Sequence, residues 1–213
     1  MSEKIKSYST TEEKMNVYSH LFGLLLSIVG LILLLVKSFH SGTVLSTVSY
    51  AIFGASMITL YLASTLYHAS VDEKKRKRLN VFDHSAIYVL IAGTYTPFSL
   101  LGLQGAWGWS IFGVVWGIAV IGVVLKLFFT GRFRLASTIS YVLMGWVIVV
   151  AIKPLIERFP FEGLMWLAAG GFSYTFGAVL YQVKRIPYNH ALFHFFVLLG
   201  TFTHFMGIYL YTK

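Results

Sequence analysis

The 213-residue sequence contains no cysteine, which excludes disulfide bonds, thiolate metal sites and cysteine nucleophiles. Charged residues are scarce as well, at 12% against about 25% in an ordinary soluble domain. Hydrophobic residues make up 57% of the chain, and a soluble fold of this size cannot cover so much apolar surface. The same composition excludes a disordered chain. It indicates a polytopic membrane protein.

Seven apolar runs are long enough to cross the hydrocarbon core as helices, which need about 20 residues each. Backbone polar groups in a bilayer must be satisfied within the span, and the runs lack the alternation of barrel strands. We therefore predict an all-α, seven-transmembrane-helix bundle that forms one domain over residues 1–213, with residues 1–17 as an N-terminal segment. The predicted spans are roughly 18–36, 44–67, 81–103, 107–127, 135–152, 163–183 and 190–211.

The N-terminal segment carries signals for the start of a helix. Ser9 and Thr10 are each followed three residues later by a glutamate, Glu12 or Glu13, which is the pattern of a capping box. We expect a helix to begin there and to continue into the first span. Acidic residues in this segment and the absence of a small-residue cleavage site after the first run argue against a cleaved signal peptide.

The net charge of +9 is distributed unevenly along the chain. Thirteen of the 17 Lys and Arg residues fall in the N-terminal segment and in the second, fourth and sixth loops. The positive-inside rule then predicts a cytoplasmic N-terminus and an external C-terminus. The positive charge faces anionic lipid head groups, so we expect membrane lipids and no nucleic acid as partners. The cluster Lys74–Arg78 is either a topology signal, which we favour, or a lipid-binding site.

Ionisable residues inside membrane spans are rare and usually functional. Asp83 is the one acidic residue that begins an apolar span, the third, and His68 lies near the end of the second. His190 and His194 begin the seventh span. In the predicted topology, three separate spans therefore bring one carboxylate and three imidazoles to the same depth, near the cytoplasmic surface.

The spacing of these residues suits a metal ion. His190 and His194 share one helix face, about 6 Å apart along the axis, and such a pair can chelate an ion, with His68 as a third ligand. Three histidines and an open position form a catalytic zinc pattern. Asp83 is then a candidate general base for water. Ser64, four residues before His68, is a candidate to orient a ligand or to stabilise an oxyanion.

Each of these residues also has a plainer interpretation. A His-x-x-x-His pair often occurs by chance, Asp83 at the start of a span is a candidate helix cap, and His68 and His84 are candidates for interfacial groups. We favour the metal site because the separate explanations would all have to hold at once. His204 lies about 15 Å deeper than His194, so we expect it to form a hydrogen bond between helices.

Three motifs resemble the hemolysin III branch of the progestin and adiponectin receptor (PAQR) superfamily. They are Glu13-x-x-Asn16-x-x-Ser19-His20, Ser64-x-x-x-His68 with the later Asp83, and His190-x-x-x-His194. The resemblance implies seven spans with the N-terminus inside, a zinc ion on the three histidines reached by Asp83 through water, and kinship with intramembrane ceramidases. Glu13, Asn16 and His20 share one helix face, and we predict that they support the ligands. Direct ligation by His20 is the alternative.

The first functional hypothesis is a zinc-dependent intramembrane hydrolase of lipid amide or ester bonds, linked to membrane lipid homeostasis and placed in a bacterial plasma membrane. The alternatives are a non-enzymatic membrane regulator or receptor with a structural zinc ion, and a hemolysin-type cytolytic protein. A water-filled pore needs a polar stripe, which the first, fourth and fifth spans do not offer. The substrate and the oligomeric state do not follow from the sequence.

Overall fold

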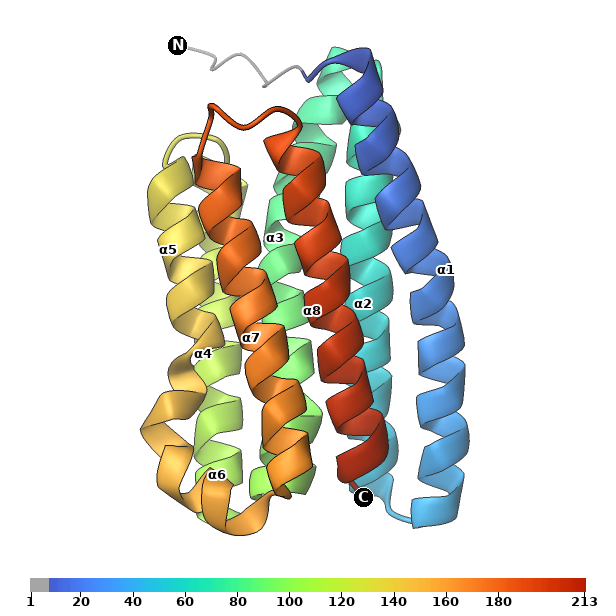
Figure 1. Ribbon diagram of the computed structural model, residues 1–213, viewed down its shortest axis with the longest axis vertical. Helices are drawn as coiled ribbons and strands as arrows, with labels where there is room; N and C mark the ends of the chain where they lie inside the picture. Colours follow the sequence, from blue (N-terminus) through green and yellow to red (C-terminus); the bar gives the residue numbers. More distant parts are fainter. Residues whose placement is uncertain (1–7) are drawn as a thin grey trace.

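Long helices run up and down between the two ends of the molecule (Figure 1). The structure is a computed structural model and describes residues 8–213. Within that range there are no strands, and seven helical segments are long and apolar enough to cross a membrane. The predicted all-α bundle of seven spans is therefore confirmed. Lys4 and Lys6, which contribute to the predicted orientation, lie outside the described residues, as does most of the first half of the 1–17 segment.

Six of the seven spans are built on one continuous α-helix each. The third of them continues into a π-helical turn, η1, and the fifth span is divided into three pieces. The elements are α1 (Thr10–Ser41), α2 (Val44–Ala69), α3 (Glu73–Pro97), η1 (Phe98–Leu103), α4 (Gly105–Phe129), α5 (Arg134–Gly145), η2 (Val147–Ala151), α6 (Ile152–Arg158), α7 (Phe161–Gln182) and α8 (Asn189–Tyr211).

The first helix begins where the capping pattern predicts. Ser9 is the N-cap of α1, and its side-chain oxygen accepts a hydrogen bond from the backbone N–H of Glu12 at 3.2 Å. This bond satisfies one of the N–H groups that a helix start leaves without a partner. Helix α1 therefore extends well before the apolar run that signals its membrane span.

Helix α3 begins earlier than the sequence predicts. Asp72 is its N-cap and accepts from the backbone N–H of Lys75 at 2.7 Å, so the cationic cluster Lys74–Arg78 lies in the first turns of the helix and not in a loop. The interpretation of Asp83 as a helix cap is consequently wrong, because Asp83 lies well inside α3. The hydropathy signal marks where a span enters the membrane, whereas the helix starts at its cap.

The fifth span is predicted as one run over 135–152, but the structure interrupts it. Pro154 has no N–H, and its ring clashes with the carbonyl four residues earlier, which belongs to Val150 in the 3₁₀ segment η2. Tyr95 of α3 supports the interruption: its hydroxyl donates to the carbonyl of Gly145 at 2.7 Å and accepts from the N–H of Ile148 at 3.0 Å. The broken helix thereby keeps its backbone groups bonded inside the bilayer.

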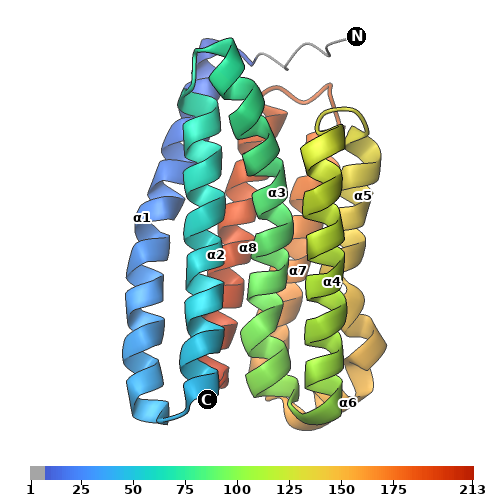
Figure 2. The ribbon, with the colours of Figure 1, turned by 180° about the vertical axis from the view of Figure 1, so that it is seen from behind.

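The order of helix packing determines where a site can form. Helix α1 packs against α2 and α8, α2 packs against α3, and α7 packs against α8 (Figure 2). Helix α3 has the largest buried share of the seven spans. The connections α2–α3, α4–α5 and α7–α8 lie at the end where α1 begins (Figure 1), which we call the N-terminal end. The other end, which holds the C-terminus, is the C-terminal end.

Candidate metal centre and adjoining cavity

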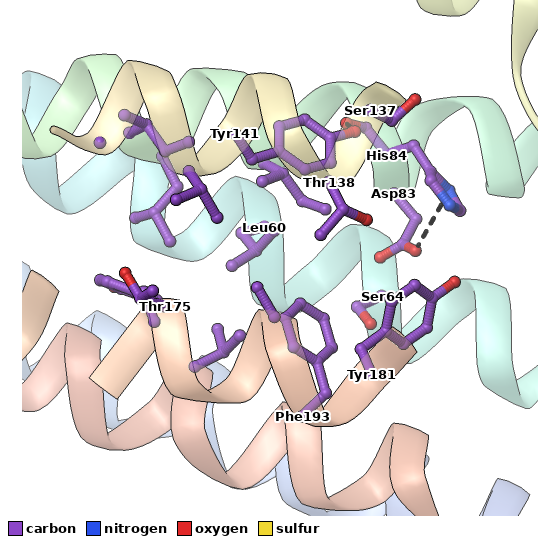
Figure 3. Close-up of a pocket in the computed structure, with 18 of the residues that line it drawn as sticks. Leu60, Ser64, Asp83, His84, Ser137, Thr138, Tyr141, Thr175, Tyr181 and Phe193 are labelled. Carbon is purple, nitrogen blue, oxygen red and sulfur yellow. Dashed lines mark hydrogen bonds and ion pairs between the residues drawn. The ribbon is translucent and has the colours of Figure 1, made fainter. Parts of the chain in front are cut away.

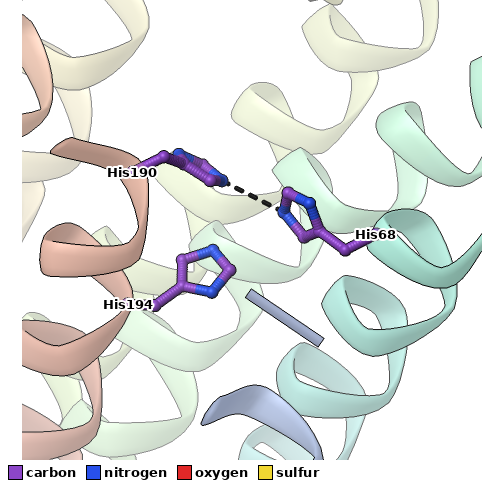
Figure 4. A group of neighbouring side chains, drawn as sticks. All are labelled: His68, His190 and His194. Carbon is purple, nitrogen blue, oxygen red and sulfur yellow. Dashed lines mark hydrogen bonds between the residues drawn. The ribbon is translucent and has the colours of Figure 1, made fainter. Parts of the chain in front are cut away.

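Three histidines from two helices meet at the N-terminal end of the bundle. His68 lies in the last turn of α2, and His190 and His194 lie in the first turns of α8. All three are buried, and their ligand atoms lie within 4.8 Å of one another. Nε2 of His68 and Nε2 of His190 are 3.0 Å apart (Figure 4). The predicted convergence of these three side chains is confirmed, and the group has the size of a metal site.

Glu13 fixes the orientation of the His68 ring. Its Oε2 atom lies 2.7 Å from Nδ1 of His68, and its Oε1 atom accepts a hydrogen bond from the guanidinium of Arg76. With Nδ1 turned to Glu13, Nε2 of His68 faces His190. A carboxylate on the far nitrogen of a histidine is the usual support of a metal-bound imidazole. The sequence motif includes Glu13, whereas the role of Arg76 has no local sequence signal.

The start of α8 depends on α1. The N-cap residue Tyr188 has a left-handed backbone with φ of 55° and forms no side-chain cap. Glu12 supplies the missing acceptor, since its Oε1 accepts from the backbone N–H of His190 at 3.2 Å. A carboxylate at a helix start is favoured by the exposed N–H groups there. The sequence pattern around Glu12 predicts only the capping box of α1 and gives no signal for this contact.

Two further residues of the first motif, Asn16 and His20, lie buried beside the histidines. The His20 ring stacks on the His194 ring, with centroids 3.6 Å apart and planes 10° apart. Nδ2 of Asn16 lies 3.4 Å from Nδ1 of His68. His20 is not a member of the group of close ligand atoms. Asn16 and His20 therefore pack against the candidate ligands.

A cavity of about 150 Å³ adjoins the histidines. Figure 3 shows Ser64, Asp83 and Phe193 among the side chains that line it. His190 and His194 line it, as do Asp83 from α3 and Ser64 from α2. Ser64 Oγ is buried and has no hydrogen-bond partner among residues 8–213. Oδ2 of Asp83 lies 3.7 Å from Nδ1 of His84, and Asp83 does not belong to the group of close ligand atoms. The two predicted catalytic side chains thus share one cavity with the histidines.

Most of the cavity wall is apolar. It continues away from the histidines between α2, α3, α5, α7 and α8, where side chains such as Leu60, Ile87, Ile91, Val142 and Phe193 line it. Apolar walls with a few polar groups at one end are typical of sites that bind amphiphilic ligands. The cavity therefore offers space for an apolar chain beside the histidine group.

Tyr8 covers the histidine group from the N-terminal end. Its ring stacks on the ring of His190, with centroids 4.6 Å apart and planes 18° apart. Burial raises the pKa of the Tyr8 phenol above its ordinary value, so the phenol remains protonated and neutral at physiological pH. Tyr8 also lines a small second cavity together with Tyr67, His84 and His190. No motif in the sequence marks Tyr8 as part of the site.

His204 lies apart from the metal candidate, as predicted. Its Nε2 atom is 3.0 Å from the carbonyl oxygen of Leu167, so the ring links α8 to α7 through a hydrogen bond. The ring also lines the cavity, and its Nδ1 atom has no hydrogen-bond partner among residues 8–213.

The fold and the buried histidines define a multi-pass helical membrane protein with a candidate metal centre. The chain belongs to the haemolysin III family, since the family described as "Haemolysin-III related" matches residues 8–205. This result confirms the resemblance on which the motif analysis relied.

Relatives from bacteria and from animals align with nearly the whole chain. "Hemolysin-3" of Bacillus cereus is 43% identical, over 99% of this chain and 97% of the relative. "Hemolysin-3 homolog" of Bacillus subtilis (strain 168) is also 43% identical, over 96% of both chains. "Monocyte to macrophage differentiation factor" of Homo sapiens is 26% identical, over 94% of this chain and 84% of the relative. These relatives are consistent with the PAQR superfamily.

Proposed function

We propose that this protein is a zinc-dependent hydrolase that cleaves amide or ester bonds of lipids within the membrane. The observation that carries the proposal is the group of three buried histidines, with ligand atoms within 4.8 Å of one another, at the polar end of an apolar cavity that Asp83 also lines. A lipid can place its chain in such a cavity and its polar bond beside the histidines.

The residues present fit a zinc ion. Imidazole nitrogen is a preferred zinc ligand, and three histidines with one open position are a catalytic donor set. Each of the three rings is buried, and Glu13 holds the far nitrogen of His68 at 2.7 Å, as expected for an oriented ligand. When bound, zinc supplies a Lewis acid that polarises a carbonyl and makes water more acidic.

The protein's own side chains have separate roles in this proposal. Asp83 accepts the proton of the attacking water as a general base, because its carboxylate lines the same cavity as His190 and His194. Ser64 Oγ, buried and without a partner among the described residues, donates to the oxygen that gains negative charge. Glu13 acts as a positioning residue through His68, and Asn16 and His20 pack against the ligands.

A structural zinc site in a non-enzymatic regulator is the alternative for the same histidines. Structural sites are normally closed by four protein ligands, whereas the described residues offer three close ligand atoms and an adjoining cavity. The adjoining cavity leaves room for a water molecule or a substrate at the fourth position, which favours a catalytic site over a structural one.

The name of the relatives favours a second candidate function, cytolysis. "Hemolysin-3" of Bacillus cereus is 43% identical to this chain. A pore needs a continuous polar lining, yet the outward faces of α1 and α4 carry large apolar side chains such as Leu25, Val29, Val120 and Val124. These faces suit contact with lipid chains, so we rank cytolysis second.

We also propose a bacterial plasma membrane location with the N-terminus in the cytoplasm. The proposal is supported by the two Bacillus relatives and by the concentration of Lys and Arg on the N-terminal side of the predicted topology.

Hydrolysis by the purified protein in liposomes tests the proposed function. The substrates are fluorescent lipid amides and esters, and the matched variant is His68→Ala/His190→Ala/His194→Ala. We expect release of the fluorescent acid by the wild-type protein and loss of release with the triple variant. Release should be normal with His40→Ala, because His40 is exposed at the far end of α1 and does not line the cavity. Equal rates for the wild type and the triple variant would overturn the hydrolase. Leakage of a trapped dye from the same liposomes would support the cytolytic candidate.

A further inference from the structure

A buried lysine that the hydrolase does not use lies at the N-terminal end of the cavity. Lys126, in the last turn of α4, is only 5% exposed and lines the cavity together with His84 and Ser137. Its ammonium donates to Ser137 Oγ at 2.5 Å and lies 5.6 Å from the centre of the Tyr141 ring. A lysine that only marked topology would extend its ammonium into the aqueous interface.

The Lys126 ammonium has no acidic partner within residues 8–213. No carboxylate oxygen in that range lies within 4 Å of it. Asp83 is the one acid among the described residues that lines the cavity, and it pairs with His84, whose Nδ1 atom lies 3.7 Å from its Oδ2 atom. An ammonium has three donor hydrogens, and its burial without a counter-charge is costly. The bond to Ser137 uses one of these hydrogens, so the ammonium can donate further hydrogen bonds to a ligand in the cavity.

A second cation lies at the same end. Arg134, the first residue of α5, lines both the large cavity and the small one. Arg134 is exposed and forms no ion pair with residues 8–213. The α5 start has no side-chain cap, so its N–H groups add positive potential. Asp83 is the one acid among the described residues that lines the cavity, so Lys126 and Arg134 give this end of an otherwise apolar cavity a net positive charge.

We propose that Lys126 and Arg134 bind the anionic head group of an amphiphile whose apolar chain lies in the cavity. The shared chemistry is an oxyanion, either the phosphate of a lipid head group or the carboxylate of a fatty acid. Lysine and arginine both bind such groups through charge-assisted hydrogen bonds. Ser137 holds the Lys126 ammonium in place when the ligand is absent.

Binding itself needs no metal and no hydrolysis. If the bound lipid is also the substrate or the product of hydrolysis, the inference rests on the proposed function. The enzyme would then act on an anionic lipid and not on a neutral one.

The test compares three probes that share one chain. They are oleate, 1-oleoylglycerol 3-phosphate and neutral 1-oleoylglycerol, each radiolabelled and bound to purified full-length protein in a neutral detergent. We expect the wild type to bind at least one anionic probe about tenfold more tightly than the neutral one. Tighter binding of the phosphate probe identifies a head group, and tighter binding of oleate identifies a fatty acid.

Variants assign the preference to the two cations. Lys126→Met should weaken binding of the preferred anion by about tenfold and leave the neutral probe unchanged. Arg134→Met should weaken it by a smaller factor, and because Arg134 is exposed this variant is not expected to disturb folding. The matched control is Arg132→Met, two residues before Arg134 in the loop between α4 and α5, since Arg132 does not line either cavity and its guanidinium lies over the Phe133 ring.

The outcomes separate this inference from the hydrolase. Discrimination by the triple histidine variant, without hydrolysis, supports the anion site independently of the metal. The inference is overturned by wild-type protein that binds the neutral probe as tightly as both anions. It is equally overturned by Lys126→Met and Arg134→Met variants that keep the anion preference, even if hydrolysis is observed.

Discussion

At the C-terminal end of the bundle, two cationic side chains donate hydrogen bonds to backbone carbonyls. The ammonium of Lys37 in α1 donates to the carbonyl of Tyr209 and, at 2.5 Å, to that of Thr212, at the end of α8. Arg158 donates to the carbonyls of Leu103 and Gln104 at 2.8 and 3.2 Å. These cations satisfy the carbonyls that helix ends leave without partners.

At the N-terminal end, the buried cation meets a different environment. Lys126 donates to a hydroxyl and lines a cavity, and the candidate ligand atoms of the three histidines lie within 4.8 Å of one another. His204 combines the two environments, because its Nε2 atom lies 3.0 Å from the carbonyl oxygen of Leu167 while its ring also lines the cavity. We infer that a buried polar group bonded to a helix carbonyl mainly stabilises the fold, whereas one without such a partner is available to a ligand. Four predictions test this contrast.

The largest effect is expected for Asp83→Asn. This change preserves shape but removes the general base, so lipid hydrolysis should fall by about 100- to 10,000-fold. Zinc content should stay close to that of the wild type, because Asp83 lies outside the group of close ligand atoms. Rates measured in liposomes beside metal analysis check both statements. An unchanged rate would remove Asp83 from the mechanism.

Glu13→Gln should weaken zinc binding by about 10- to 100-fold, because it removes the charge that orients His68. Competition with a chelator of known affinity measures this change. Glu73→Gln is the control, since Glu73 is exposed and pairs with Lys77 in the same helix, and this variant should leave affinity unchanged. Equal affinities for Glu13→Gln and the control would show that Glu13 serves the fold alone.

Substitution of the two lysines should separate their roles in stability. Lys37→Met should destabilise the protein by about 1.5–3 kcal/mol, the range for hydrogen bonds to a charged group, because carbonyls of α8 lose their donor. Lys126→Met should be neutral or stabilising, since it removes a buried charge without an acidic partner in the described range. Denaturant unfolding in detergent compares the two, and a greater loss with Lys126→Met would contradict the contrast.

The smallest effect is expected for His204→Leu. The variant loses one hydrogen bond between α8 and α7, which corresponds to about 1 kcal/mol. Zinc content should remain at the wild-type level, as metal analysis will show. A loss of zinc with this variant would mean that His204 supports the metal centre and does not only link helices.

The sequence predicts well those features that depend on apolar runs along the chain or on short local motifs. Apolar runs locate the seven spans because span length is set by the bilayer, and alternating loop positions bring His68, His190 and His194 to one depth. The start of α1 follows from Ser9 and Glu12, whose signal is local.

The features that the sequence does not reveal depend on contacts between distant residues. Glu12 accepting from the N–H of His190 joins the start of α1 to α8, and no spacing rule covers such a pair. The broken fifth span needs both Pro154 and the Tyr95 hydroxyl of another helix. Lys126 resembles any topology lysine until its burial against a cavity is known. Tertiary packing decides each of these cases.

The central claim is that the three histidines hold a metal, and its most direct test is the zinc content of protein purified without chelators. Mass spectrometry of the wild type should find about one zinc ion per chain. The His68→Ala/His190→Ala/His194→Ala variant, folded and purified in the same way, should contain almost none. A wild-type protein without metal, or a triple variant with as much zinc as the wild type, would contradict the claim.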